Sequence, residues 1–289
     1  MNTNSFHFNN FHYMKRFAVT ISVVATLAAS CAGIEPPSPS SVADLPVPHQ
    51  LRVYPAVSAP VIDGDLSDSC WESAATIPTL FPARGVTGAS LQSTIVKAVW
   101  TNDFLYVAFD CVDAEVWSSG QLKHDDNIYT EDVVEIFIDG KGDQRQYIEI
   151  QIAPDGTNLD LMYVFSHSGE MEHTADGRVV DAISRRDRWG FREWEMVGLK
   201  TAARKTERGW TAEAALPAAQ IVRRLGVKEF ASGMELRVQF MRYDHVPVVE
   251  SDDSSKRRII QQNWVPVVHG NPHNSPALFG TLKLLSIAE

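Results

Sequence analysis

Cysteine is scarce in this chain, whose 289 residues include three, Cys31, Cys70 and Cys111. They form no Cys-x-x-Cys pair, so the spacing of a zinc ribbon or a thioredoxin-like redox site is missing. The sequence also lacks a Gly-x-Ser-x-Gly elbow, a His-Glu-x-x-His motif and a phosphate-binding glycine loop. Acidic pairs such as Glu131-Asp132 and Asp125-Asp126 are weak signals for a glycosidase, because neighbouring strand residues face opposite ways. We therefore expect a protein that is not an enzyme.

Basic residues are outnumbered by acidic ones. The chain has 26 Lys and Arg against 36 Asp and Glu, a formal net charge of −10. Without the first 30 residues, which hold two basic and no acidic side chains, the charge becomes −12, or 24 minus 36. This balance disfavours nucleic acid and anionic lipid as partners, because binding to phosphate needs clustered Lys and Arg.

The apolar run at residues 17–29 is too short to span a membrane and follows Lys15 and Arg16, which is typical of a signal peptide. It ends in Leu27-Ala28-Ala29-Ser30-Cys31, which resembles the lipobox of bacterial lipoproteins. The resemblance implies cleavage before Cys31 and lipid attachment to its thiol, with simple secretion as the alternative. Ala32, which follows Cys31, lacks the charge that retains some lipoproteins in the inner membrane. We therefore expect the protein to be anchored in the outer membrane of the cell envelope, at its periplasmic or surface face.

Three segments follow from this interpretation. Residues 1–30 form the lipoprotein signal peptide. Residues 31–50 are rich in proline and serine without an amphipathic period, and we expect an extended tether. Residues 51–289 then form the folded domain.

Strand patterns dominate the remaining sequence. Residues 95–100 and 105–110 are rich in β-branched and aromatic residues, and Asn102 and Asp103 between them predict a hairpin whose turn uses positive φ. A short helix is expected at 217–225, between Pro217 and Gly226. The other expected strands are 133–139, 147–152, 159–165, 194–202, 210–215, 236–243 and 279–285. This pattern predicts an all-β protein, an antiparallel β-sandwich of jelly-roll type with one or two short helices.

Two strands show which side chains share a face. In 147–152 the isoleucines alternate with Glu149 and Gln151, which is typical of a sheet packed on one side. In 133–139, Glu135 shares its face with Phe137 and lies opposite the inward aliphatic residues. A carboxylate beside an aromatic ring suits sugar recognition, which combines hydrogen bonds to hydroxyl groups with stacking on the pyranose ring.

The start of the domain carries an Asp63-Gly64 turn signal and a large apolar anchor, Trp71. In an envelope protein Cys70 and Cys111 could form a disulfide, or they could be two buried free thiols. The sequence leaves both alternatives open.

Three blocks, at residues 61–74, 105–113 and 129–139, together resemble carbohydrate-binding module family 9. The resemblance continues through residues 147–157, 210–217 and 276–282 and covers almost all of 53–285. It implies a sandwich related to DOMON-like folds, of a kind often attached to secreted glycoside hydrolases and found with bound calcium.

The resemblance also implies ligand-binding positions. The two aromatic residues that hold the sugar ring would fall at Tyr129 and at His273, where sugar-binding members have tryptophan. The ligand-facing glutamine would be Gln239, with Arg242 near the same end, and Trp264 is a nearby aromatic residue that could substitute for the missing tryptophan. Together with Glu135, these residues form the expected glycan site.

Calcium, the one cofactor expected, requires oxygen ligands. The candidate carboxylates are Asp63 and Asp65, with Asp68 beside them, and Asp110 and Asp113. The alternative is that each aspartate shapes a turn or caps a strand.

Two other functions are open. Some DOMON-like relatives bind haem b for electron transfer, using Met with Lys or His as axial ligands. The candidates are Met162, Met171, Met196, Met241, His167 and His173. A protein-binding scaffold or adhesion role is the other alternative. The expected function is non-catalytic binding of an oligo- or polysaccharide by an envelope lipoprotein, for carbohydrate catabolism.

Overall fold

The computed structural model describes residues 49–83, 91–139, 146–165, 188–225, 229–248, 256–266, 272–274 and 279–287. The chain divides into two compact units, 1–38 and 39–289, and every described residue belongs to the second. The predicted lipidation site Cys31 and the signal peptide therefore lie outside the described residues. Of the described helices, none is long and apolar enough to cross a membrane.

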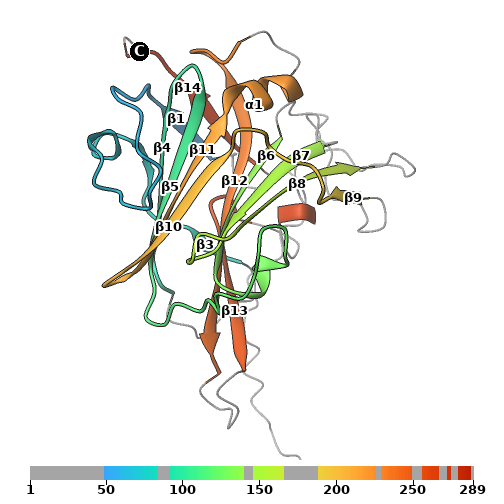
Figure 1. The fold of residues 1–289 in the computed structure, drawn as a ribbon. Helices are drawn as coiled ribbons and strands as arrows, with labels where there is room; N and C mark the ends of the chain where they lie inside the picture. Colours follow the sequence, from blue (N-terminus) through green and yellow to red (C-terminus); the bar gives the residue numbers. More distant parts are fainter. Residues whose placement is uncertain are drawn as a thin grey trace, which may run out of the picture. The chain divides into compact units, whose positions relative to one another are not determined.

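The described residues of the second unit form two sheets (Figure 1). The larger has nine strands, in the order β1 (Gln50–Val53), β14 (Gly280–Leu284), β12 (Glu235–Pro247), β6 (Val133–Asp139), β7 (Gln146–Ile152), β8 (Asn158–Phe165) and β9 (Arg188–Phe191), with β13 (Arg257–Asn263) beside β12 and β3 (Phe81–Pro82) beside β13. The smaller has five, in the order β10 (Lys200–Thr206), β11 (Gly209–Pro217), β5 (Phe104–Val112), β4 (Thr94–Trp100) and β2 (Ala75–Ile77).

Among the described strands the pairings are antiparallel, except that β1 runs parallel to β14. The described helical elements are α1 (Ala218–Leu225) and the short turns η2 (Ser69–Trp71), η3 (Ile128–Thr130) and η5 (Pro272–Asn274). The prediction of an all-β sandwich with one short helix near 217–225 is confirmed.

Both sheets contribute their inner faces to one hydrophobic core. Phe109 of β5 packs edge-on against Phe240 of β12, with ring centroids 6.0 Å apart. The inward residues of β6 and β7 are the aliphatic ones that strand alternation predicts. The prediction that the sheet is packed on one side only at β7 was wrong. Glu149 and Gln151, on the outer face of β7, are buried, so the larger sheet is covered on both sides there.

The predicted hairpin is β4 and β5, with Trp100 opposite Leu105. Its turn differs from the prediction, because Asp125 is the one described residue other than glycine with positive φ. Thr101 shapes the turn instead: its N–H donates to the Phe104 carbonyl at 2.9 Å, and its Oγ1 accepts the N–H groups of Asp103 and Phe104 at 3.3 and 3.2 Å.

Some strand boundaries were wrong or missed. The strand expected at 194–202 begins at Lys200, because Gly198, at φ 90°, closes a turn before it. Strand β1 begins at Gln50, inside the stretch assigned to the tether. Strands β2, β3, β9 and β13 were not expected, since they are short or rich in charged and polar residues.

Glu213 of β11 fixes the start of the domain to the outer face of the smaller sheet. Its carboxylate accepts the N–H groups of Asp63 and Gly64 at 3.1 and 2.7 Å and the indole N–H of Trp71 at 2.8 Å. Gly64 has φ 83°, and a Cβ there would lie 2.9 Å from the Ala203 carbonyl carbon. The predicted Asp63-Gly64 turn and Trp71 anchor are confirmed.

The two described cysteines are free and buried on opposite faces of the smaller sheet. Cys111 points into the main core, whereas Cys70 packs with Trp71 on the outer side. The disulfide alternative is therefore wrong, because side chains on opposite faces of a sheet cannot meet. Burial raises the pKa of the Cys111 thiol to about 12, so this thiol is protonated and unreactive at neutral pH.

Replacing Glu213 should test how strongly it holds the first segment. We expect Glu213→Ala to lower the free energy of unfolding by about 3 kcal/mol, because three N–H donors, two of them in buried hydrogen bonds, lose their acceptor. Urea denaturation followed by tryptophan fluorescence measures the change. The control is Glu235→Ala on β12, whose exposed side chain pairs with Lys283 and should change stability by less than about 0.5 kcal/mol. Equal effects of the two variants would contradict the conclusion that Glu213 holds the first segment of the domain on the smaller sheet.

Candidate functional site

A row of five residues crosses the outer face of the larger sheet, and because three of them, Asn263, Glu135 and Gln151, are polar, we call it the polar row. Strand register places Asn263 of β13, Met241 of β12, Glu135 of β6, Gln151 of β7 and Leu159 of β8 side by side. All five are buried. The row exists because the polar residues occupy the outward positions of strands whose alternate residues fill the core.

Aromatic rings adjoin this row. Tyr147 and Tyr163 face each other across β7 and β8 with ring centroids 5.0 Å apart. The ring of His273, from η5, lies 5.0 Å from Tyr163 and 5.3 Å from Phe137. Tyr163 and His273 are half-buried, so the aromatic group reaches the surface beside the buried polar row.

Two glutamates occupy neighbouring strands of this face. Glu135 and Glu149 are each 1% exposed. Gln151 Nε2 donates to Glu149 Oε1, and His273 Nε2 lies 3.6 Å from Glu149 Oε2. Burial, and then the charge of Glu149, raise the pKa of Glu135 well above its ordinary value of 4.5. The raised pKa favours the protonated carboxyl form, which can donate as well as accept a hydrogen bond.

Three atoms of the row are buried without a hydrogen-bond partner among the described residues: Glu135 Oε2, Gln151 Oε1 and Asn263 Nδ2. Such atoms are rare in folded proteins and mark places where a water molecule or a ligand completes the hydrogen bonds. The two oxygens lie on the neighbouring strands β6 and β7, and the amide donor lies on β13, which β12 separates from β6. Hydroxyl groups both donate and accept, so they can complete such hydrogen bonds.

Residues 62–286 match the family model for carbohydrate family 9 binding domain-like proteins. The chain belongs to this family. The sequence resemblance and the predicted fold are thus confirmed. No curated protein matches the chain.

Solved structures share the fold. A carbohydrate-binding module of family 9 from Caldicellulosiruptor kristjanssonii in complex with cellotriose has a TM-score of 0.53 at 19% identity, covering 81% of this chain and 94% of that one. The same organism's module in complex with glucose has a TM-score of 0.54 at 20% identity, covering 81% and 96%. A proposed carbohydrate-binding protein from Bacteroides uniformis has a TM-score of 0.55 at 14% identity, covering 82% and 100%.

Four of the residues expected to bind ligand in this family 9 domain lie on the outer face of the larger sheet, and one of them, Gln239, is beside Phe137. Glu135 is at its centre, and His273 contacts the aromatic group beside it. Tyr129 is in η3, which packs on the same face through Ile128, and the Tyr129 side chain is 40% exposed. The carbonyl of Tyr129 lies 3.2 Å from His245 Nε2, which places η3 at the margin of the face.

Gln239 and Trp264 have structural contacts instead. The amide of Gln239 donates to the Val265 carbonyl and accepts the Val265 N–H, each at 2.8 Å, which joins β12 to the segment after β13. Trp264 is 4% exposed in the main core and stacks 5.6 Å from Phe240. Neither side chain is available to a ligand in this arrangement.

Arg242 points into the sandwich and away from the outer face. Its guanidinium group is fully buried, 2.9 Å from Asp113 Oδ2 and 3.6 Å from Asp244 Oδ2, and it donates to the Val112 carbonyl at 2.8 Å. Asp132, close to both aspartates, accepts the N–H groups of Trp117 and His245. The arginine supplies the positive charge for this buried acidic group, which is a core role.

The proposed calcium ligands are separated. Asp63 Oδ1 and Asp65 Oδ1 accept the N–H groups of Asp65 and Ser67 at 2.9 and 3.1 Å, as turn-forming aspartates do. Asp113 is in the buried arginine network. Asp63, Asp65, Asp110 and Asp113 thus do not form a single cluster among the described residues.

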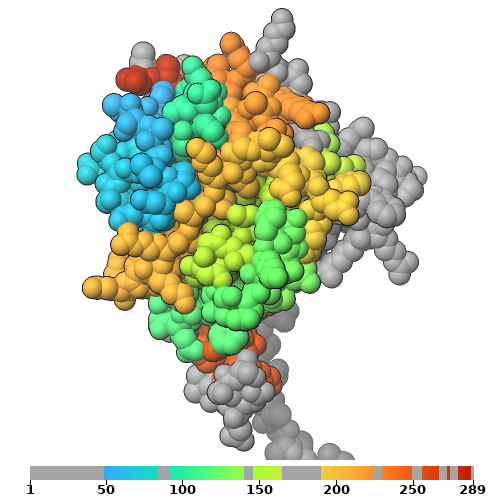
Figure 2. All heavy atoms as spheres, viewed as in Figure 1, coloured from blue at the N-terminus to red at the C-terminus, as the bar shows by residue number. Residues whose placement is uncertain are grey.

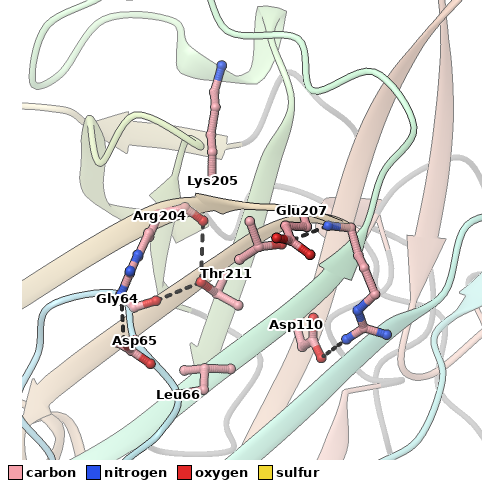
Figure 3. A pocket seen from close by; sticks show the side chains of 10 residues that line it. Gly64, Asp65, Leu66, Asp110, Arg204, Lys205, Glu207 and Thr211 are labelled. Carbon is pink, nitrogen blue, oxygen red and sulfur yellow. Dashed lines mark hydrogen bonds and ion pairs between the residues drawn. The ribbon is translucent and has the colours of Figure 1, made fainter.

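Asp65 and Asp110 line a surface groove of about 820 Å³ on the smaller sheet (Figure 3). Arg204 pairs with Asp65 at 2.6 Å, and Arg208 pairs with Asp110 at 3.2 Å. None of the ten residues that line the groove is aromatic. Its charges are already matched and it offers no ring for stacking, so the groove fits a sugar less well than the outer face of the larger sheet.

Several site residues were not expected from the sequence. Tyr147, Tyr163, Gln151, Glu149 and Asn263 join the face through strand pairing. For the β7 residues, the alternation in the sequence showed that they share one face of the strand. It predicted that this face is exposed and did not reveal that it is buried. Of the proposed haem ligands, Met196 lies in the core and Met241 on the outer face, while Met162 is half-buried. Met171, His167 and His173 lie outside the described residues.

Removing the buried guanidinium should cost much stability. We expect Arg242→Ala to lower the free energy of unfolding by about 3–5 kcal/mol, because Asp113 and Asp244 stay buried without a counter-charge. Chemical denaturation measures this, with the exposed Arg223→Ala on α1 as the control, expected within about 0.5 kcal/mol of wild type. Wild-type stability of Arg242→Ala would show that the network contributes little.

Glu135 should make stability depend on pH. Because the pKa of Glu135 is raised in the folded chain, the unfolded chain ionises first, so the contribution of Glu135 to stability is fully present below about pH 4.5 and is lost as the pH rises toward the folded pKa. Glu135→Gln cannot ionise and keeps the shape, so we expect a flatter profile and a gain of about 1 kcal/mol or more over wild type at pH 8. Urea denaturation from pH 5 to 9 measures both, with exposed Glu207→Gln as the control. Parallel profiles for Glu135→Gln and wild type would contradict this assignment.

Proposed function

We propose that this protein binds an oligo- or polysaccharide without catalysis, through the outer face of the larger sheet. Family membership supports the ligand class, and the row of buried polar atoms supports the place. Glu135, Gln151 and Asn263 would hydrogen-bond sugar hydroxyl groups, and the half-buried rings of Tyr163 and His273 would stack on the pyranose C–H surface.

The observation that carries this proposal is the set of buried atoms on β6, β7 and β13 that have no hydrogen-bond partner among the described residues. A sheet face evolved only for stability would fill those positions with apolar residues, since each unmade hydrogen bond costs about 1–3 kcal/mol. Hydroxyl groups of a bound ligand would make these hydrogen bonds and so recover that cost.

A chain of β-1,4-linked glucose units is the ligand to test first. Cellotriose and glucose occupy the related Caldicellulosiruptor modules. Because the identity to these modules is at most 20%, the sugar is a proposal that rests on the shared fold and on the chemistry of the face.

A lipid anchor at Cys31 would place this domain at the cell envelope, in the outer membrane. The protein would then concentrate glycan near secreted glycoside hydrolases. Contacts to one sugar unit are weak, so several anchored copies engaging one polymer would raise the overall affinity.

Glycan binding should depend on the polar row. We would screen the purified chain on a glycan array and then titrate the best ligand by calorimetry. Glu135→Ala and Gln151→Ala should each weaken binding about tenfold or more, equivalent to about 1.4 kcal/mol for a lost hydrogen bond. The control is Asp110→Ala in the charged groove, which should bind like wild type. A folded wild-type chain that binds no glycan would refute the function, whereas loss of binding in Asp110→Ala alone would move the site to the groove.

Tyr129 should be tested against a tyrosine of equal exposure. Its side chain is 40% exposed, and that of Tyr54, after β1, is 38% exposed. If η3 forms one wall of the sugar site, Tyr129→Ala should weaken glycan binding about fivefold or more, because a stacked ring contributes about 1 kcal/mol. Tyr54→Ala should leave calorimetric affinity unchanged. Equal affinities for the two variants would exclude Tyr129 from the site.

A further inference from the structure

Three segments away from the polar row bring one histidine and three carboxylates together. His124 and Asp125 lie in the loop before η3, Asp160 lies on β8, and Glu195 lies in the turn segment before β10. Each offers one ligand atom, and these atoms lie within 4.8 Å of one another. Figure 2 shows the green, yellow-green and gold surfaces of these segments adjoining on one face.

The imidazole ring of His124 is oriented for metal binding. Its Nδ1 lies 3.0 Å from the Asn158 carbonyl oxygen and 2.8 Å from the Asn158 side-chain oxygen. A carbonyl only accepts, so Nδ1 carries the hydrogen, and in neutral imidazole the lone pair is then on Nε2. Metal-binding histidines commonly donate their other N–H to a backbone carbonyl in this way.

Nε2 of His124 faces the three carboxylates. It lies 3.2 Å from Glu195 Oε1, 3.6 Å from Asp125 Oδ1 and 3.9 Å from Asp160 Oδ1. Four ligands in a tetrahedron around an ion, with bonds of about 2.1 Å, are about 3.4 Å apart. The observed separations bracket that value.

The carboxylates keep oxygen atoms unused. Asp160 is 2% exposed, and its Oδ2 accepts the Met196 N–H, while its Oδ1 lies toward His124. Asp125 Oδ1 is buried without a hydrogen-bond partner among the described residues. Arg192 donates to the Asp125 carbonyl and to Asn127, and not to the three carboxylates. The cluster therefore places three carboxylates around Nε2 of His124, which is also within hydrogen-bond distance of Glu195 Oε1, and one of their oxygens, Asp125 Oδ1, is buried without a hydrogen-bond partner among the described residues.

We propose that His124, Asp125, Asp160 and Glu195 bind one divalent transition-metal ion, for which Zn²⁺ is the best fit. Calcium takes oxygen ligands, whereas one imidazole with carboxylates suits zinc. The side chains of His124 and Glu195 are 47% and 57% exposed, so the ion can enter from solvent. The bound ion would fasten the loop before η3 to β8 and to the segment before β10.

Zinc titration of the purified full chain tests this site. After treatment with a chelator and dialysis, calorimetry with ZnCl₂ at pH 7.5 should give one ion per chain, and zinc should raise the Tm. His124→Gln should weaken zinc affinity about 100-fold or more, and so should Glu195→Gln, whose exposed side chain makes misfolding an inadequate explanation. His49→Gln, which changes a histidine packed on Phe81 and Trp264, should bind zinc like wild type.

Two outcomes would overturn the proposal. One is zinc affinity no tighter than millimolar in the wild type, which would show that a protonated His124 balances the acids without an ion. The other is wild-type zinc affinity in both His124→Gln and Glu195→Gln, which would place the ion elsewhere. A CaCl₂ titration under the same conditions should give clearly weaker binding; calcium bound as tightly as zinc would contradict the transition-metal assignment.

Discussion

The burial of both faces of β6 is the constraint on which the rest of the structure depends. All seven residues of this strand are buried, yet it lies at the centre of a sheet whose other face could have been open to water. The inner face is covered by the smaller sheet, and the outer face by η3 and by aromatic side chains around His273. Polar residues on the outer face are thereby removed from bulk water, so their hydrogen bonds must be made within the fold or with a ligand.

The same constraint explains how charge is arranged inside the domain. Arg242 and Glu213 each hold together segments distant in sequence, one through carboxylates and the other through N–H donors. Both groups have several partners, as buried ionic groups require. In contrast, Glu135 Oε2 is buried without a hydrogen-bond partner among the described residues, and burial, followed by the charge of Glu149, raises the pKa of Glu135. The difference separates residues that stabilise the sandwich from those available for binding.

Local patterns predicted the strands well. β-branched alternation predicted β4 to β8, β11, β12 and β14, and the Pro217 signal predicted α1, because these depend on nearest neighbours. The pairing order could not be read in this way, so Arg242 and Trp264, expected near the ligand, lie in the core. Parity along a strand assigns side chains to two faces, but which face is inward for β12 depends on its distant neighbours β6 and β13. The metal-ligand cluster was missed for the same reason, since its members come from three segments.

The parallel pairing of β1 with β14 has a mechanical consequence. The first and last strands of the described fold run in the same direction, joined by hydrogen bonds such as Thr281 N–H to the His49 carbonyl and Leu285 N–H to the Val53 carbonyl. A force that pulls the chain before β1 one way and the chain after β14 the other slides these strands past each other. All their hydrogen bonds are then loaded together and do not open one by one. A domain held at its N-terminal side while a polymer drags on it would resist tension through this pair of strands.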